Sequence, residues 1–222
     1  MSSGEVGQQM LPGTAGFGSA DLAERAREAM VQRALYAGAE LSRRLAEERS
    51  GEIARAGLLL ADCFRSGNKV LLFGNGGSAA DAQHVSAEFT GRFTRDRAPL
   101  PAIALTCDTS AITAIGNDYG YEHVFARQLR ALGREGDVAF AISTSGNSPN
   151  VVLAAETARA LCMPVIALTG PGGGKLGTLA DILLEVPPAP GARLQECHLA
   201  IEHILCEIVE AELFWGLPDG TD

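Results

Sequence analysis

Five short apolar runs, separated by segments of helical spacing, constrain the fold of this chain more than any other feature. The runs are continuously apolar, which is typical of strands that are covered on both faces of a parallel sheet. Strands that alternate with helices form βαβ units, whose right-handed crossovers place helices on both faces. We therefore predict a doubly wound, flavodoxin-like α/β fold with a five-stranded parallel sheet. The predicted strands are Lys69–Phe73, Pro101–Leu105, Val138–Ile142, Pro164–Leu168 and Ile182–Val186.

Helical spacing predicts the elements around these strands. A pair of N-terminal helices is expected from Asp21 to about Arg49 and from about Glu52 to Phe64, and a long C-terminal helix over about Ala192–Phe214. The glycine-rich gap over residues 169–180 has room for no more than a short helical turn. Between the strands we expect helices over Ser78–Phe93, Thr109–Ile115, Glu122–Leu132 and Pro149–Leu161.

No linker divides this pattern, so we predict a single domain over residues 21–215. Residues 1–20 are rich in Gly, Ser, Gln and Ala and carry neither a basic nor an apolar leader region, so we predict a flexible tail there and a second tail over residues 216–222. The five cysteines form no CxxC pair, which favours reduced thiols and a cytoplasmic location.

Composition and charge exclude several classes of protein. Hydrophobic residues make up 46% of the 222 residues, which argues against a disordered chain. The chain lacks the run of about 18 apolar residues that a membrane-spanning helix needs, so we expect no membrane partner. The net charge of −9 argues against a nucleic-acid partner. The acidic surplus lies from Asp181 onward, where Arg193 is the one basic residue.

Two strand ends carry the residues of a candidate anion site. Gly74-Asn75-Gly76-Gly77-Ser78 follows the first strand, and Ser143-Thr144-Ser145-Gly146-Asn147-Ser148 follows the third. Each opens a helix, with Ser78 and Ser148 as N-cap candidates and Pro149 at the first helical position. Hydroxyls and N–H groups at a helix N-terminus can hold an anion without lysine. Both segments could also be tight connections alone.

A second set of candidates lies on two helices. His84 and Glu88 are four residues apart, which places both side chains on one helix face near the first glycine turn. The last helix carries Gln195, His198 and His203. From spacing alone, His84 and Glu88 could be an ordinary surface pair, and a histidine on an apolar helix is more often part of the core than a ligand.

These motifs together resemble the phosphoheptose isomerases of the sugar isomerase (SIS) family. The resemblance covers about residues 21–215. Its central segments are the glycine turn with Asp81, Ala82, His84 and Glu88, and the hydroxyl-rich Ser143–Ser148. The other motifs that carry it are Thr90-Gly91-Arg92, Gly116-Asn117-Asp118, Leu168-Thr169-Gly170 with Gly173 and Gly174, and Arg193-Leu194-Gln195-Glu196 followed by His198 and His203.

The resemblance implies an enzyme that isomerises D-sedoheptulose 7-phosphate to D-glycero-D-manno-heptose 7-phosphate through an enediol(ate). It implies Glu88 and His203 as the catalytic acid/base pair, and a homotetramer with sites built between subunits. It implies one zinc ion per subunit, held by His84, Glu88, Gln195 and His203. Because an amide is an unusual zinc ligand, we expect that metal to be labile. The implied substrate-binding residues are Asn75, Gly76, Gly77, Ser78, Glu88, Asn117, Asp118, Ser143, Thr144, Ser145, Ser148 and Gln195.

Three alternatives stay open at this point. One branch of SIS proteins forms tetrameric, non-catalytic scaffolds that bind the bacterial replication initiator, and parts of this chain resemble it. That branch lacks the acid/base residues, whereas Glu88, Gln195 and His203 are present here. Other SIS modules sense a sugar phosphate for regulation, but no DNA-binding domain is attached to this one. Another phosphosugar could also be the substrate, because the sequence does not measure the length of the sugar.

Overall fold

The computed structural model describes residues 19–216, in two units that meet between Ala37 and Gly38. In the first unit, the helix exposes Leu22, Met30 and Leu35 to solvent. The second unit contains the sheet. The predicted tails 1–20 and 216–222 lie outside the described residues, apart from the helical Ser19 and Ala20 and the terminal Gly216.

The prediction of an N-terminal pair of helices is wrong, because helix α1 runs unbroken from Ser19 to Arg65. The break was placed at Ser50-Gly51, but glycine inside a helix costs only about 1 kcal/mol relative to alanine. Burial on both sides of this point outweighs that cost, since Leu45 and Ile53 are each about 5% exposed. A Cβ built on Gly51 would meet nothing within 4 Å, so no packing requirement explains the glycine.

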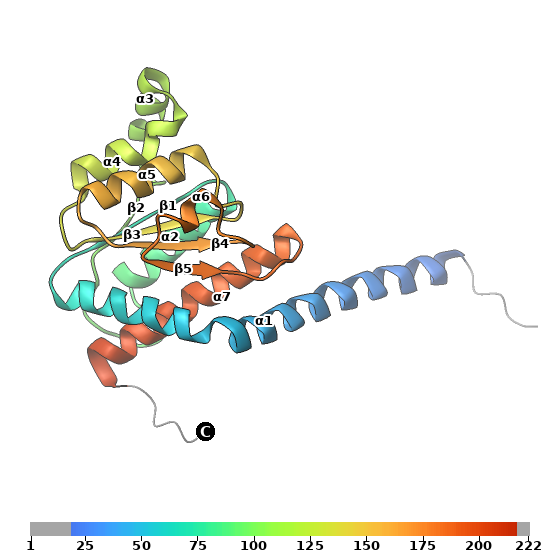
Figure 1. Ribbon diagram of the computed structural model, residues 1–222. Coiled ribbons are helices and arrows are strands. Elements are labelled where there is room, and N and C mark those ends of the chain that lie inside the picture. Colours follow the sequence, from blue (N-terminus) through green and yellow to red (C-terminus); the bar gives the residue numbers. More distant parts are fainter. Residues whose placement is uncertain (1–18, 217–222) are drawn as a thin grey trace, which may run out of the picture. The chain divides into compact units, whose positions relative to one another are not determined.

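The predicted parallel sheet is confirmed (Figure 1). Its strand order, β2-β1-β3-β4-β5, is that of a flavodoxin-like doubly wound fold. Each predicted run overlaps its strand, and every pair of neighbours is parallel. The strands are β1 (Val70–Gly74), β2 (Ala102–Ala104), β3 (Val138–Ser143), β4 (Val165–Thr169) and β5 (Ile182–Glu185).

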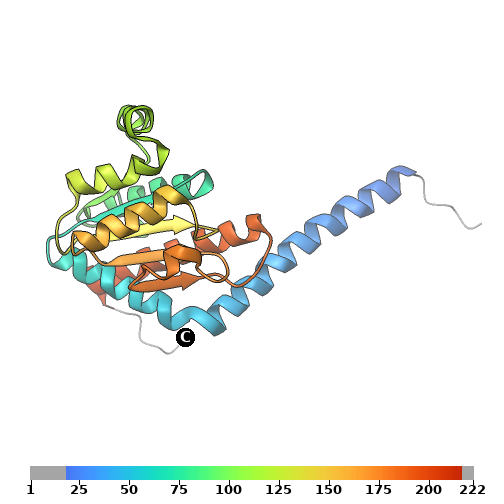
Figure 2. The same ribbon diagram turned by 45° about the horizontal axis from the view of Figure 1, so that its top comes forward.

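Helices cover both faces of the sheet (Figure 2). The part of α1 after Gly38 packs on one face with α2 (Gly77–Thr90) and α7 (Gly191–Glu210). The other face is covered by α4 (Val124–Leu132) and α5 (Pro149–Ala160). Successive residues of β1 alternate between the two cores, with Leu72 in the first and Leu71 and Phe73 in the second. Both faces of the central strands β1, β3 and β4 are therefore buried, which is why these strands are largely apolar.

The remaining elements are short. Helix α3 (Thr109–Tyr119) and the 3-10 turn η1 (Tyr121–His123) contain no buried residue, and Figure 1 shows α3 beyond α4, away from the sheet. The predicted short turn is α6 (Gly174–Gly177), and the predicted C-terminal helix continues from α7 into the π-helical turn η2 (Ala211–Trp215). No helix within residues 19–216 is long and apolar enough to span a membrane.

The strand order fixes where a ligand can bind. The connections from β1 and β3 leave in opposite directions, so a crevice opens between their carboxyl ends. Gly74 is the register partner of Ile142, and a Cβ on Gly74 would lie 2.8 Å from the Ile142 carbonyl oxygen. The glycine turn and the hydroxyl-rich loop, taken as residues 143–148, therefore lie side by side.

Candidate active site

A reciprocal pair of side-chain amides joins the glycine turn to the first turn of α5. Asn75 Nδ2 donates to Asn150 Oδ1, and Asn150 Nδ2 donates to Asn75 Oδ1, and each hydrogen bond is 2.8 Å long. Asn150 is 2% exposed, and Asn75 Oδ1 also accepts from the Tyr121 hydroxyl at 3.2 Å. The Asn75 amide is thus held by the protein, and Gly76 and Gly77 are the exposed residues of this turn.

The hydroxyl-rich loop ends in the predicted cap. Ser148 is the N-cap of α5 and Pro149 takes the first helical position. Ser148 Oγ lies 3.2 Å from Ser143 Oγ, while Thr144 and Ser145 are exposed. The four hydroxyl residues of this loop therefore lie at or just before the N-terminus of a 12-residue helix.

Glycine allows close packing behind this loop. Gly146 has φ of 62°, and a Cβ there would lie 2.0 Å from the Gly173 carbonyl oxygen. The Gly146 carbonyl oxygen accepts from the Leu176 N–H, and the Thr144 carbonyl oxygen accepts from the Gly170 N–H. The segment that follows β4 thus fixes the backbone of the hydroxyl-rich loop.

The prediction that Ser78 caps α2 is wrong. The N-cap is Gly76, with φ of 57°, and Ser78 is the second residue of the helix. Because Gly76 reaches a conformation that serine rarely adopts, the chain turns two residues earlier than a serine cap would allow. Ser78 is instead buried beneath Gly74, whose hypothetical Cβ would lie 2.8 Å from the Ser78 Cβ.

The structure brings three of the candidate metal and acid/base residues together. His84 Nε2 and His203 Nε2 lie 2.8 Å apart, although 119 residues separate them along the chain. Glu88 Oε1 lies 3.5 Å from His84 Nε2. All three side chains are partly exposed. Two imidazoles in one hydrogen bond share a single proton on the bond, since one nitrogen donates and the other accepts.

Gln195 reaches the glycine turn from α7. Its side chain lies against the first turn of α2, because a Cβ on Gly77 would be 2.4 Å from Gln195 Nε2 and 2.7 Å from Oε1. Gln195 Nε2 donates to Asp81 Oδ1 at 3.3 Å. The amide therefore lies at the glycine turn, between the candidate sugar-binding N–H groups and Asp81.

Buried ionisable groups lie behind the cluster. Burial raises the pKa of Asp81, an effect that Gln195 and His84 partly offset. Burial, together with the charge of Asp81, raises the pKa of Glu202 to about 9, and burial lowers the pKa of His198 to about 4. Glu202 and His198 are fully buried. Both groups are therefore neutral near pH 7.

Asn117 and Asp118 stand apart from these groups. Both are exposed at the end of α3, where Asn117 Nδ2 donates to Asp118 Oδ1 at 2.8 Å. Their predicted role in binding the sugar stays a prediction.

The chemistry of the donor set fits a zinc ion. Two imidazole nitrogens, a carboxylate and an amide oxygen form an N/O set, and the two Nε2 atoms already converge. Within the described residues, no group of three or more His, Cys, Asp or Glu side chains forms a metal site as placed.

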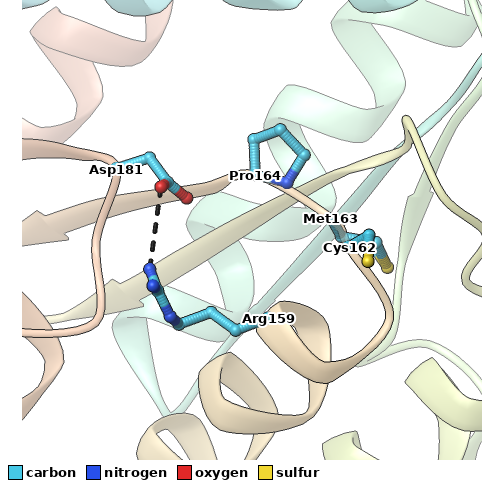
Figure 3. A pocket seen from close by; sticks show the side chains of 5 residues that line it. All are labelled: Arg159, Cys162, Met163, Pro164 and Asp181. Atoms are coloured by element: carbon cyan, nitrogen blue, oxygen red, sulfur yellow. Dashed lines mark ion pairs between the residues drawn. The ribbon is translucent and has the colours of Figure 1, made fainter.

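A separate pocket of about 290 Å³ lies at the opposite edge of the sheet (Figure 3). Pro164 and Asp181 line it just before β4 and β5 begin, and Arg159 pairs with Asp181 at 3.6 Å. Cys162 and Met163 also contribute to its wall. Because the candidate loops follow the carboxyl ends of β1 and β3, this pocket is not part of the candidate site.

Sequence reasoning missed three buried residues that support the site, namely Asn150, Arg97 and Glu210. An asparagine within two residues of the N-cap was a weak signal for Asn150. No sequence motif surrounds Arg97 or Glu210, and only the ion pair in the folded structure identifies them.

Comparison with known proteins agrees with this geometry. A family model described as SIS domain matches residues 35–170. The phosphoheptose isomerase of Campylobacter jejuni is 54% identical over 160 residues, which cover 72% of this chain and 86% of that protein. The chain belongs to the phosphoheptose isomerases of the SIS domain family.

Other relatives extend the match. The phosphoheptose isomerase of Aquifex aeolicus is 49% identical over 180 residues, or 81% of this chain and 94% of that protein. The structure of the phosphoheptose isomerase of Neisseria gonorrhoeae covers 85% of this chain and 98% of its own, with a TM-score of 0.76 and 44% identity. The predicted family, fold and enzyme class are thereby confirmed, and the replication-initiator scaffold receives no support.

Proposed function

We propose that this chain isomerises D-sedoheptulose 7-phosphate to D-glycero-D-manno-heptose 7-phosphate. The observation that carries the proposal is the convergence of His84, Glu88 and His203, from α2 and α7, beside the loops of a phosphoheptose isomerase fold. The steps below derive what each group does in that reaction.

The phosphate is held at the N-terminus of α5. Thr144 and Ser145 present exposed hydroxyls there, Ser143 and Ser148 lie next to them, and the helix dipole favours an anion. The chain has a net charge of −9, so its surface as a whole does not attract the phosphate. The uncharged hydroxyl and N–H donors of this loop bind the phosphate at short range instead. The sugar then extends from this loop across the crevice toward Gly76, Gly77 and Gln195.

The proton transfers belong to Glu88 and His203. Ketose to aldose conversion removes a proton from C1 and returns one to C2, while a second proton moves between the oxygens on those carbons. The Glu88 carboxylate takes the proton from C1 and returns it to C2. The His203 imidazole serves the oxygen-bound proton, because its two ring nitrogens can donate or accept a proton. His84 shares a hydrogen bond with His203 and so orients its ring.

We propose that His84, Glu88, Gln195 and His203 hold one zinc ion per subunit. When bound, zinc would act as a Lewis acid that stabilises the negative oxygen of the enediolate. Glu88 has both a ligand role and a proton role in this scheme, which favours a labile metal. Gln195 would contribute its amide oxygen, since Nε2 donates to Asp81.

We propose that the chain acts as a homotetramer. The supporting observation is an apolar groove of about 230 Å³ between α1 and α7, lined by Leu45, Ile53, Ala200, Ile204 and Ile208. A second copy of the chain is the occupant that fits the assembly implied by the family. Light scattering tests this proposal, with a tetramer expected for the wild type and smaller species for Ile204→Asp. A wild-type monomer would contradict it.

A cytoplasmic location fits the thiols. All five cysteines are free, including the exposed Cys107 and Cys162, and free thiols are typical of reducing compartments. Fractionation of the native cells tests the location.

The function is tested with purified protein, Zn²⁺ and sedoheptulose 7-phosphate, followed by NMR. The aldose 7-phosphate should appear. If sedoheptulose 7-phosphate stays unchanged while another phosphosugar is isomerised, the substrate assignment is wrong.

A further inference from the structure

A fully buried ion pair joins the two helices that carry the candidate site, and the proposed mechanism does not use it. Arg97 Nε donates to Glu210 Oε1 at 2.8 Å, and both side chains are 1% exposed. Arg97 lies in the loop that follows α2, and Glu210 is the last residue of α7. We call this pair and the loop that it holds, residues 91–97, the clamp.

Each residue of the ion pair also forms hydrogen bonds to the backbone of a different segment. Arg97 Nη1 and Nη2 donate to the carbonyl oxygens of Phe89 and Glu88, both at 2.8 Å. These carbonyls belong to the last turn of α2 and have no partner within the helix. Glu210 accepts the N–H groups of Phe93 and Thr94 at 3.0 and 3.2 Å. The carboxylate thereby fixes the loop, and the guanidinium fixes the end of the helix that carries Glu88.

The clamp reaches the candidate site through Phe93. The ring of Phe93 lies on the ring of His203, with centroids 5.4 Å apart and an interplanar angle of 33°. The His203 ring therefore contacts two other rings, that of His84 on α2 and that of Phe93 in the clamp loop. His84 also forms a hydrogen bond with His203. The contact of Phe93 with His203 depends on Glu210, because Glu210 accepts the backbone N–H of Phe93.

We propose that Arg97 and Glu210 are positioning residues for the reaction, which set the spacing of the α2 side chains His84 and Glu88 relative to His203 on α7. The inference rests on the proposed function for the role of those three residues. Because Arg97 binds the Glu88 backbone and Glu210 holds the loop that covers His203, a shift of the pair moves both halves of the site. A purely structural ion pair would change stability alone.

The chain offers a matched control, Asp137, at the amino end of β3. Asp137 is 2% exposed and accepts two backbone N–H groups, from Lys69 and Arg134, together with the Lys69 ammonium. It therefore resembles Glu210 in burial and in partners, but it lies just before β3 begins, whereas the site loops follow the carboxyl ends of β1 and β3. Glu210→Gln and Asp137→Asn each remove one charge and keep the shape.

The experiment compares full-length wild type, Glu210→Gln, Arg97→Lys and Asp137→Asn. Three readouts are taken well below the melting temperature: the NMR resonances of the His203 ring protons, assigned with His203→Gln; the Zn²⁺ affinity by calorimetry; and kcat and KM. We expect Glu210→Gln to move the His203 resonances, to weaken Zn²⁺ binding by about ten-fold or more, and to lower kcat more than it changes KM. Arg97→Lys should show the same pattern more weakly, because lysine keeps the charge but not the fork. Asp137→Asn should lower the melting temperature alone.

The proposal is overturned if Glu210→Gln and Asp137→Asn behave alike, with lower stability and wild-type values in all three readouts. If Glu210→Gln fails to fold, Phe93→Leu decides. A fall in Zn²⁺ affinity and kcat in that variant supports the clamp, and wild-type values overturn it. A wild type that does not isomerise the substrate refutes the proposed function, while the His203 resonances still test the clamp in that case.

Discussion

Gly77→Ala should separate activity from stability. A methyl group at residue 77 would lie 2.4 Å from Gln195 Nε2 and 2.7 Å from both Cδ and Oε1. Carbon and nitrogen at ordinary contact are about 3.4 Å or more apart, so the amide must retreat by about 1 Å. The φ of Gly77 lies outside the left-handed region, so alanine causes no backbone strain there.

The energetic consequences differ between folding and catalysis. For folding, the retreat breaks the bond from Gln195 to Asp81, which at 3.3 Å is worth about 1 kcal/mol or less. For the reaction, a misplacement of about 1 Å at the site costs roughly 100-fold in rate, or about 2.7 kcal/mol. We therefore expect kcat/KM to fall by roughly 100-fold while the melting temperature changes by only a few degrees.

A double-mutant cycle identifies the cause. Kinetics and thermal unfolding are measured for Gly77→Ala, Gln195→Ala and the double variant, with Gly51→Ala as the control because a Cβ there meets nothing. The double variant should be no slower than Gln195→Ala alone, since the methyl group then has no amide to displace. Full activity in Gly77→Ala, or losses that multiply in the double variant, would refute this account of Gln195.

Three further predictions follow from the same geometry. Glu88→Gln and His203→Gln should each reduce turnover by 100-fold or more, with unchanged circular dichroism; substantial activity in either would remove that residue from the acid/base pair. Asn150→Ala breaks both bonds to Asn75 and should raise KM more than it lowers kcat, measured by steady-state kinetics, whereas an unchanged KM would show that the two loops hold their positions independently. Burial raises the folded-state pKa of Glu202 to about 9, so the folded state binds that proton more tightly than the unfolded chain does. The stability of metal-free wild type relative to Glu202→Gln should therefore fall as the pH rises from 5 to 9 in urea titrations, and a difference independent of pH would contradict the burial argument.

Much of the fold could be predicted because burial on both sheet faces leaves a direct mark on sequence. The runs around Leu71 and Phe140 are apolar at every position, and each such run is a strand. The continuity of α1 through Gly51 was not predictable in this way, since it depends on the burial of Leu45 and Ile53. Local propensity is a weak force beside such burial.

The candidate site was predictable to the extent that its residues lie in local motifs. His84 and Glu88 share a face by their spacing, and the hydroxyls of Ser143–Ser148 follow a strand. The contact of His84 with His203 spans 119 residues and arises only when α2 and α7 pack on the same face. Glu210 carries no local motif of its own and Asn150 only a weak one, so three-dimensional packing reveals their bonds to residues 93–97 and to Asn75.

The central claim is that the Glu88 and His203 cluster isomerises a ketose 7-phosphate, and its most direct measurement is NMR of sedoheptulose 7-phosphate with the purified chain. The account predicts that wild-type protein with Zn²⁺ produces D-glycero-D-manno-heptose 7-phosphate and that Glu88→Gln under the same conditions leaves the ketose unchanged. Absence of product with the folded wild type, or equal product formation by Glu88→Gln, would contradict it.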